Sequence, residues 1–195
     1  MTGELEYSLP PAIRRISGAF LWAGRVSFWI QIFLGAIAGI TLLFTSVNLF
    51  VDQTTRSTPG AGVGFFFSGC GLATLFVGTF WAFRYIQMAR RLRSRDESRR
   101  PKPKEALRIL KLGLYISLTG MLLTLLGAEA LVGALVEKSF SQGIAVLPRG
   151  GGNINQIIEI TPFDMFVVLA TTNIQLAHFV GLVSSLWVLN SVNRT

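Results

Sequence analysis

The stretch that decides the fold is RYIQMARRLRSRDESRRPKPKEALRILK, residues 84–111. It holds eleven Lys and Arg residues against three acidic residues. Apolar stretches precede and follow it, at residues 63–86 and 112–136. Each is long enough to cross a ~30 Å hydrocarbon core at ~1.5 Å per residue. A basic segment between two such stretches is the positive-inside signal, which predicts that residues 84–111 form a cytoplasmic loop.

The composition agrees with a membrane protein. Hydrophobic residues make up 51% of the chain and charged residues only 14%, whereas soluble domains carry roughly 25% charged residues. Two further apolar runs, at residues 28–51 and 163–189, bring the number of predicted spans to four. The sequence therefore predicts an all-α integral membrane protein with four transmembrane helices, in which residues 1–195 form a single membrane domain.

The distribution of charge predicts the topology. Fifteen of the 18 Lys and Arg residues fall in the N-terminal segment, the central loop and the C-terminal tail. With an even number of spans, both termini share the side of that loop, so the N and C termini are predicted to be cytoplasmic. We also expect the loop to contact anionic lipid headgroups through Arg90, Arg91, Arg93, Arg95, Arg99 and Arg100. The net charge of +8 can indicate nucleic-acid binding, but topology accounts for it and no recognition motif accompanies it, so no nucleic-acid partner is expected.

The segment before the first span, residues 9–27, has an amphipathic pattern. Pro10 and Pro11 can begin a helix, because the first helical turn tolerates proline. Ile13, Ile16 and Phe20 then share one face. This pattern predicts an interfacial helix that leads into the first span. A plain extension of that span is the alternative.

Small residues recur four positions apart in every predicted span. This spacing lets helix backbones approach closely, which favours helix association in lipid. We expect a compact bundle, with a small-residue face left for a partner as a second use of the pattern. The predicted packing or partner residues are Gly35, Gly39, Gly69, Ala73, Gly113, Ser117, Ala177, Gly181 and Ser185.

The fourth span carries a polar stripe. Asp164, Thr171, Gln175, His178 and Ser185 are spaced so that they share one helical face. Exposing such groups to hydrocarbon costs free energy, so the stripe is expected to face the bundle interior, a water-filled cavity or a partner. Two interpretations are open, interhelical hydrogen bonding and an ion pathway or ligand site, and we favour hydrogen bonding.

Glu129, Asp164 and His178 are the candidate metal ligands, because transition metals bind carboxylate and imidazole groups. From their places in antiparallel spans, Glu129 and His178 differ by ~12 Å in predicted depth. They cannot share one ion without tilt, a kink or a neighbouring copy. We therefore predict no cofactor, and iron enters only as the cargo of the transport alternative below.

Enzymatic chemistry is not expected. The glycine-rich segments 60–64 and 149–153 do not continue into the Gly-Lys-Ser/Thr of a phosphate-binding loop. Cys70 and His178 are the lone cysteine and histidine, which excludes a cysteine-based metal site and a paired-histidine motif. No serine lies in a recognisable nucleophile elbow.

Two stretches carry a family resemblance: GRVSFWIQ at residues 24–31 and TNIQLAHFVGLV at residues 172–183. Together with four spans and a basic central loop, they resemble the cyanobacterial relatives of a chloroplast inner-envelope family. That family is described both as a "permease in chloroplasts" and as a component of the inner-envelope protein import translocon. The resemblance implies the thylakoid or plasma membrane of a cyanobacterium, and association with a larger photosynthetic or translocation complex. It brings no catalytic residues.

Two function classes follow. In the first, the protein is an auxiliary factor in protein translocation or membrane-complex assembly, with the lipid bilayer and other membrane proteins as its partners. In the second, it is an iron or other metal-ion permease, which must act as a homo-oligomer because four helices enclose little cavity. A permease needs ligands at several depths, and the sequence offers few, so we favour the auxiliary role.

The topology gives a first prediction. Cysteines introduced singly at Ser98 and Ser141, in a Cys70→Ala background, should react with an impermeant maleimide from opposite faces of sealed vesicles, because the basic residues hold residues 84–111 on the cytoplasmic side. Labelling of intact vesicles is compared with labelling after detergent opens them. Reaction of both positions from the same face contradicts the four-span topology.

Overall fold

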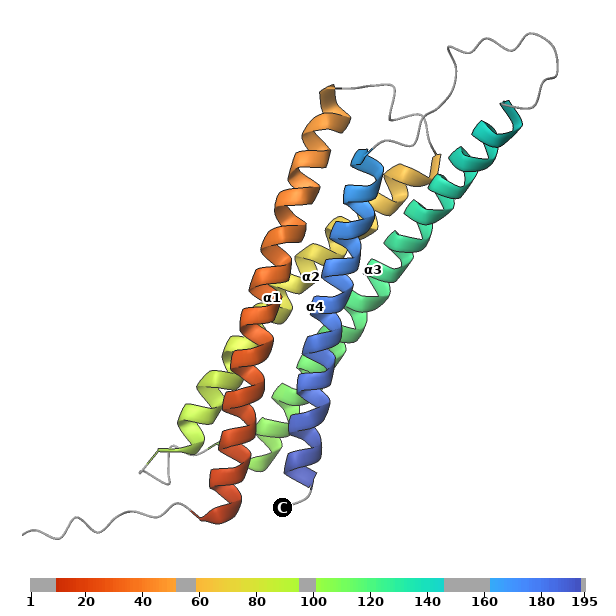
Figure 1. Cartoon of the computed structure of the whole chain (residues 1–195). Helices are drawn as coiled ribbons and strands as arrows, with labels where there is room; N and C mark the ends of the chain where they lie inside the picture. The colour runs from red at the N-terminus through yellow and green to blue at the C-terminus, as the bar shows by residue number, and fades with distance from the viewer. Residues whose placement is uncertain (1–9, 52–58, 95–100, 146–161, 194–195) are drawn as a thin grey trace, which may run out of the picture. The chain divides into compact units, whose positions relative to one another are not determined.

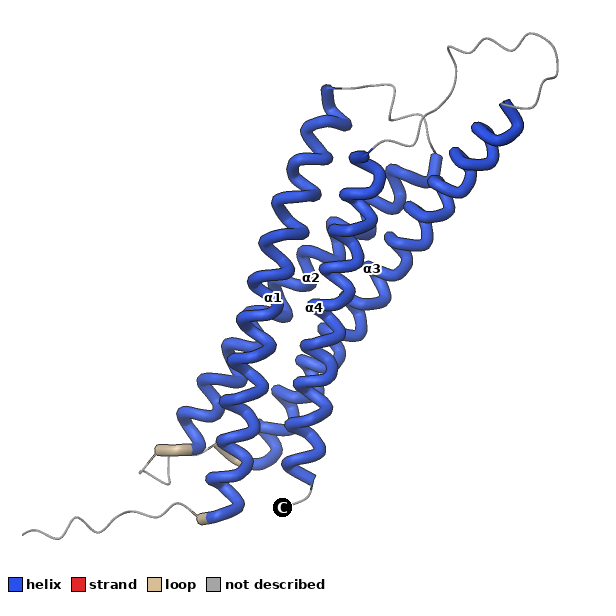
Figure 2. The backbone as a smooth tube through the Cα atoms, viewed as in Figure 1, coloured by secondary structure: helices blue, strands red, loops and turns tan. Residues whose placement is uncertain are grey.

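The computed structural model describes residues 10–51, 59–94, 101–145 and 162–193. Over these residues the regular structure is entirely α-helical (Figure 2). The helices, shown in Figure 1, are α1 (Pro11–Val51), α2 (Pro59–Leu92), α3 (Pro103–Ala145) and α4 (Pro162–Asn193). Each contains a stretch long and apolar enough to cross a membrane. The predicted all-α fold with four transmembrane helices is confirmed.

A proline opens every one of these four helices. Proline suits the first helical position because its φ is already close to the helical value and the N–H that it lacks would have no partner there. The turn before α3 shows how the start is closed. The Lys102 carbonyl accepts hydrogen bonds from the backbone N–H groups of Glu105 (2.9 Å) and Ala106 (3.3 Å). The prolines therefore fix where each helix begins.

The helices are longer than the predicted spans. α1 joins the predicted interfacial segment and the span 28–51 in one continuous helix from Pro11, whereas residue 9 lies outside the described residues. α2 continues to Leu92, and α3 runs from Pro103 to Ala145. The prediction of a loop over residues 84–111 is therefore wrong at both of its ends. Arginine, lysine and leucine are good helix formers, so hydropathy marks where a membrane would end but not where a helix ends.

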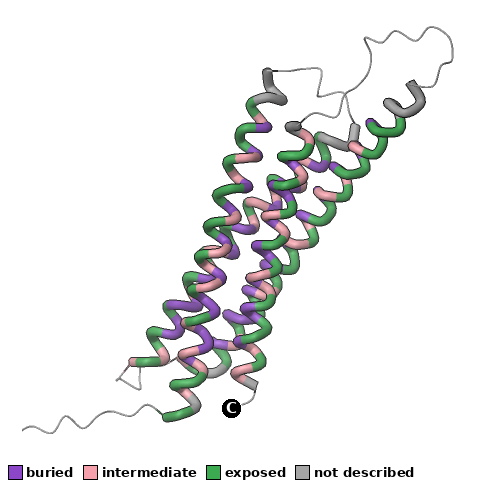
Figure 3. Tube along the Cα trace, viewed as in Figure 1, coloured by how far each residue is buried: buried purple, intermediate pink, exposed green. Residues whose placement is uncertain are grey.

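The chain divides into two compact units, and each takes a segment from all four helices. The first unit is Met1–Phe33, Thr74–Thr119 and Ala177–Thr195. The second unit is Leu34–Ala73 and Gly120–Leu176. In both units, buried positions recur every three to four residues along each helix, with exposed positions between them (Figure 3). That the chain forms one membrane domain stays a prediction.

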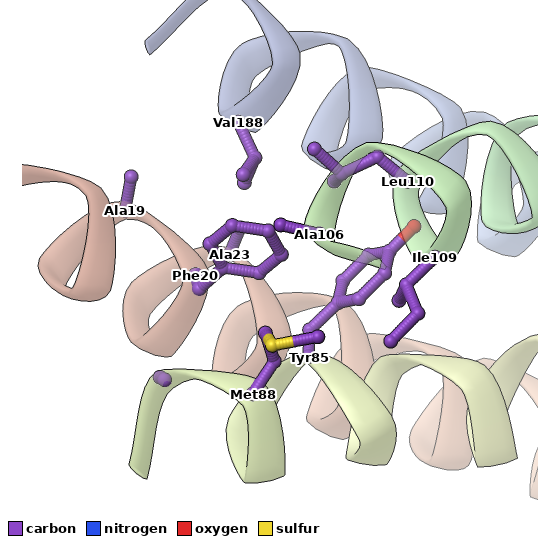
Figure 4. Close-up of a cluster of buried hydrophobic side chains, with 10 residues drawn as sticks. Ala19, Phe20, Ala23, Tyr85, Met88, Ala106, Ile109, Leu110 and Val188 are labelled. Carbon is purple, nitrogen blue, oxygen red and sulfur yellow. The ribbon is translucent and has the colours of Figure 1, made fainter. Parts of the chain in front are cut away.

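The first unit has an apolar core built around two aromatic rings. Phe20 of α1 and Tyr85 of α2 meet edge to face, with ring centroids 5.9 Å apart. Small residues on the neighbouring helix turns leave room for these rings, as Figure 4 shows. The Trp81 indole N–H donates to the Ile109 carbonyl (2.8 Å) and ties α2 to α3. The core consists of Ala19, Phe20, Ala23, Tyr85, Met88, Ala89, Ala106, Ile109, Leu110 and Val188.

The second unit depends on a reciprocal glycine contact between α2 and α3. A Cβ on Gly127 would lie 3.0 Å from the Ser68 nitrogen and 3.1 Å from the Gly64 oxygen. A Cβ on Gly64 would lie 3.0 Å from the Gly127 oxygen. The two backbones are thus in direct contact, which only glycine permits. Gly71 makes room in the same way for the Thr124 side chain.

The predicted small-residue pairs differ in their surroundings. Gly35, Gly113, Ser117, Ala177, Gly181 and Ser185 are buried, and Gly39 lies against Leu72. Gly69 and Ala73 are exposed, and nothing lies within 4 Å of a Cβ built on Gly69. These two residues do not pack within the second unit, so only their use toward a partner stays a prediction. A four-residue spacing identifies a helix face but not the direction in which that face points.

Gly127 and Gly133 of α3 give a matched test of the packing. We expect Gly127→Ala to lower the free energy of unfolding by ~1–3 kcal/mol, because the new methyl group would press on backbone atoms that cannot move aside. Gly133→Ala should leave it unchanged or raise it by up to ~1 kcal/mol, because a Cβ there meets nothing within 4 Å and alanine favours the helix. Thermal unfolding in detergent, followed by circular dichroism, measures both. Equal stability of the two variants would show that the α2–α3 contact is wrong.

Candidate functional site

A buried amide lies in the first unit. Gln31 of α1 is 2% exposed, and its Nε2 donates a long hydrogen bond to the Ala177 carbonyl of α4 (3.5 Å). Gly181 leaves the space for this amide, since a Cβ there would lie 2.5 Å from Nε2 and 2.8 Å from Ser117 Oγ. Gly78 borders the same amide from α2, with its ideal Cβ 3.8 Å from Oε1. One polar side chain thus lies against small residues of α2 and α4.

Two hydrogen bonds join α2 to α4 in the same unit. Thr74 Oγ1 lies 3.5 Å from His178 Nε2, and Tyr85 Oη lies 2.9 Å from Ser185 Oγ. Ser185 also donates to the Gly181 carbonyl (2.9 Å), so the tyrosine hydroxyl donates to the serine. Gly113 of α3 leaves the space that the Tyr85 hydroxyl fills.

The second unit has a comparable α2–α4 contact. Ser68 Oγ and Thr171 Oγ1 are 3.1 Å apart, and both residues are fully buried. Thr171, His178 and Ser185 are seven residues apart along α4, so they occupy one helical face. Each of them contacts a hydroxyl group of α2. We call these three contacts the α2–α4 ladder: Ser68–Thr171, Thr74–His178 and Tyr85–Ser185.

A buried ion pair joins α3 to α4 in the second unit. Lys138 Nζ lies 3.1 Å from both carboxylate oxygens of Asp164. The side chains are only 5% and 14% exposed. Taking these charges out of water is costly, and the contact with both oxygens compensates for that cost. Asp164 is therefore engaged in holding two helices together.

The predicted metal ligands have different surroundings. Asp164 is bound by Lys138, and Glu129 is exposed on α3. His178 is fully buried and faces Thr74. Among the described residues, no group of three or more His, Cys, Asp or Glu side chains is placed to hold a metal ion. Asp164 and His178, for which a ligand site was one interpretation of the sequence, thus contact side chains of other helices.

The polar stripe of the fourth span is mostly turned inward. Thr171, His178 and Ser185 are buried, whereas Gln175 is half-buried. The interhelical hydrogen bonding that the sequence favours is present at the three ladder positions. A role in binding a ligand or a partner stays a prediction for every residue of the stripe.

The predicted headgroup arginines have modest contacts. Arg90, Arg91 and Arg93 are exposed. Arg91 forms a loose pair with Glu105 at 4.0 Å, and the Arg93 Nε donates to Ser17 Oγ (3.2 Å). Arg95, Arg99 and Arg100 lie outside the described residues. Their contact with lipid stays a prediction.

Sequence reasoning overlooked three of the residues that shape these sites. Gln31 had a signal, because an amide inside an apolar run needs a hydrogen-bond partner when it is buried. Lys138 also had one, since the end of the third span and the start of the fourth lie at the same level when the spans are antiparallel. Tyr85 had none, because a tyrosine near the end of a span equally fits a position at the membrane interface.

Comparison with known proteins places the chain in a family. A family model described as "Protein of unknown function (DUF3611)" matches residues 10–193. The chain is 32% identical over 182 residues to Protein TIC 21, chloroplastic, of Arabidopsis thaliana, and the match covers 92% of this chain and 58% of that protein. No solved structure matches the chain. Because the family model spans all four helices from the start of α1 to the end of α4, the chain belongs to the DUF3611 family and is a relative of the chloroplast protein.

Proposed function

We propose that the protein is a non-enzymatic auxiliary factor of a photosynthetic membrane, which acts in protein translocation or membrane-complex assembly by contacts between its helices and those of other proteins. The kinship with a chloroplast protein and the import-translocon description carried by the family resemblance support a role in translocation. The chain spans 58% of the length of that relative, so the role proposed here is that of the shared membrane part.

The proposal rests on the observation that the buried polar groups form contacts between helices. Each ladder residue of α4 contacts a hydroxyl group of α2, and the Gln31 amide reaches the α4 backbone. Side chains engaged in this way hold helices in register. Such an interior suits a protein that presents its outer faces to others.

Those outer faces are large. In the most apolar window of each helix, only 28–39% of the residues are buried within the chain. Most of each membrane-spanning surface is therefore available to lipid or to other transmembrane helices. Trp29, Phe33, Ile40 and Phe140 are each at least two-thirds exposed. Helix faces of this kind associate through close packing and occasional polar contacts.

The transport alternative finds less support in the side chains. A metal pathway requires ligands that converge along a shared lumen. Asp164 instead binds Lys138, and Glu129 points outward from α3. We therefore do not favour a metal-ion permease.

Two measurements on one preparation distinguish the function classes. The tagged full-length protein, purified in mild detergent from its own membrane, should carry subunits of a translocation or assembly complex in stoichiometric amounts. The same protein in sealed proteoliposomes should move ferrous iron no faster than empty liposomes. Flux that depends on the protein, together with the absence of co-purifying subunits, would refute the auxiliary role and favour the permease.

The Lys138–Asp164 pair allows a test of structural against ligand roles. Lys138→Met or Asp164→Leu alone should lower the free energy of unfolding by ~3–5 kcal/mol, because each leaves a buried charge without its counter-ion. The double variant should recover most of that loss and keep its co-purifying subunits. Arg91→Met, at a pair that is 64% and 49% exposed, serves as the control and should change stability by less than ~1 kcal/mol. A stable double variant that lost its subunits would assign Asp164 to partner binding instead.

A further inference from the structure

Glu129 is an acidic residue on the exposed, apolar side of α3. Its neighbours on that side are about 40–47% exposed, and a Cβ on Gly133 would meet nothing within 4 Å. No hydrogen bond or ion pair joins the Glu129 carboxyl to any other of the described residues. We call this surface the Glu129 face; it consists of Leu125, Leu126, Glu129, Val132, Gly133 and Val136.

The position of Glu129 along α3 places it well inside the apolar stretch. Lys138 follows it by nine residues and Lys111 precedes it by 18, which correspond to ~13 Å and ~27 Å along the helix axis. A glutamate side chain is too short to reach the polar layer at either end. Lys138 is itself buried and held by Asp164, so it does not neutralise Glu129. Ionisable groups at such positions in membrane proteins almost always pair with another polar group.

The shape of the Glu129 face fits a helix. Leu125, Leu126, Val132 and Val136 are spaced from Glu129 by three, four and seven residues, which forms a continuous ridge along α3. Gly133 lies one turn beyond Glu129 and leaves the backbone open, so another helix can approach closely there. An apolar ridge with one acid and one gap complements a transmembrane helix that carries one basic residue.

We propose that the Glu129 face binds a transmembrane helix of another protein, and that this helix carries a Lys or Arg within its apolar stretch. The basic group pairs with the Glu129 carboxylate, and the apolar ridge packs alongside. The inference deepens the proposed function by naming the chemistry of the partner, and it rests on that function for the existence of a partner.

A second copy of the chain fits the Glu129 face less well. Two copies in one bilayer share the same orientation, so a symmetric contact through this face brings Glu129 opposite Glu129. Two carboxylates that face each other across such a contact repel. Within the described part of the second unit, Lys138 is the lone basic residue, and it is already buried against Asp164. The proposal therefore assigns the cation to a different protein.

The test uses designed peptides, so that no natural partner has to be known. Leu/Ala transmembrane peptides of about 23 residues carry Lys, Leu or Glu at one of three positions, one helical turn apart. Their binding to the labelled full-length protein in liposomes is measured by energy transfer. We expect the best Lys peptide to bind about tenfold more tightly than the Leu peptide, and we expect Glu129→Leu to remove that difference. Equal binding of the Lys and Leu peptides, or undiminished preference in Glu129→Leu, overturns the proposal.

Matched variants separate the face from the rest of the surface. Gly133→Leu should weaken binding of the Lys peptide about tenfold, because it fills the gap beside Glu129. Gly62→Leu, at an equally open and exposed glycine of α2, should leave it unchanged. Energy transfer between differently labelled copies of the protein provides a further control. A self-association that Glu129→Leu abolishes would assign the face to a second copy and contradict the proposal.

Failure here is distinguishable from failure of the proposed function. If the wild-type protein co-purifies with complex subunits but shows no preference for the Lys peptide, only the chemistry assigned to the Glu129 face is wrong. If it preferentially binds the Lys peptide and Glu129→Leu removes that preference, the inference holds even where the natural complex proves to have another role.

Discussion

Hydrogen bonds between α2 and α4 limit how these two helices can be arranged. Thr171, His178 and Ser185 recur every seven residues on α4, and each contacts Ser68, Thr74 or Tyr85 of α2. Hydrocarbon offers no water to replace such partners, so rotation of the α4 segment of either unit about its axis would leave its polar groups exposed. Each contact contributes little, about 0.6 kcal/mol on average, but within each unit such contacts favour one rotational setting of the α4 segment.

Such contacts require that the helix backbones lie close together, which is the task of the glycines. Gly64 and Gly127 place the α2 and α3 backbones in contact in the second unit, and Gly24 lets α1 approach Ala82 and Ile86 of α2 in the first. Because Gly181 has no side chain, the Gln31 amide has room to extend from α1 to the α4 backbone. Glycine is unfavourable inside an isolated helix, and the close packing that it permits offsets that cost.

Charged residues have different roles in different parts of the protein. The arginines at the ends of α2 and α3 are exposed and loosely paired, as expected of residues that set topology. Lys138 and Asp164 are buried and tightly paired, so they join helices. Glu129 has no hydrogen-bond or ion-pair partner among the described residues. Hydrogen bonds between the helices inside, and an apolar exterior that includes the acidic residue Glu129, suit a protein that works by binding other membrane proteins.

The sequence by itself determined the number of helices and the polar face of α4, and its prolines mark the helix starts that the apolar runs did not locate. These features can be read along the sequence from the length of an apolar run, the position of a proline and the spacing of residues along a helix. Tertiary structure decided that Gly69 has open space beside it, whereas Gly64 packs against α3. It also decided that Gln31 lies beside Gly181, that Lys138 binds Asp164 and that Glu129 is exposed. Each of these depends on how far a helix is rotated about its own axis. The rotation of a helix depends on the surfaces of all the neighbouring helices together. No single segment of the sequence contains that information.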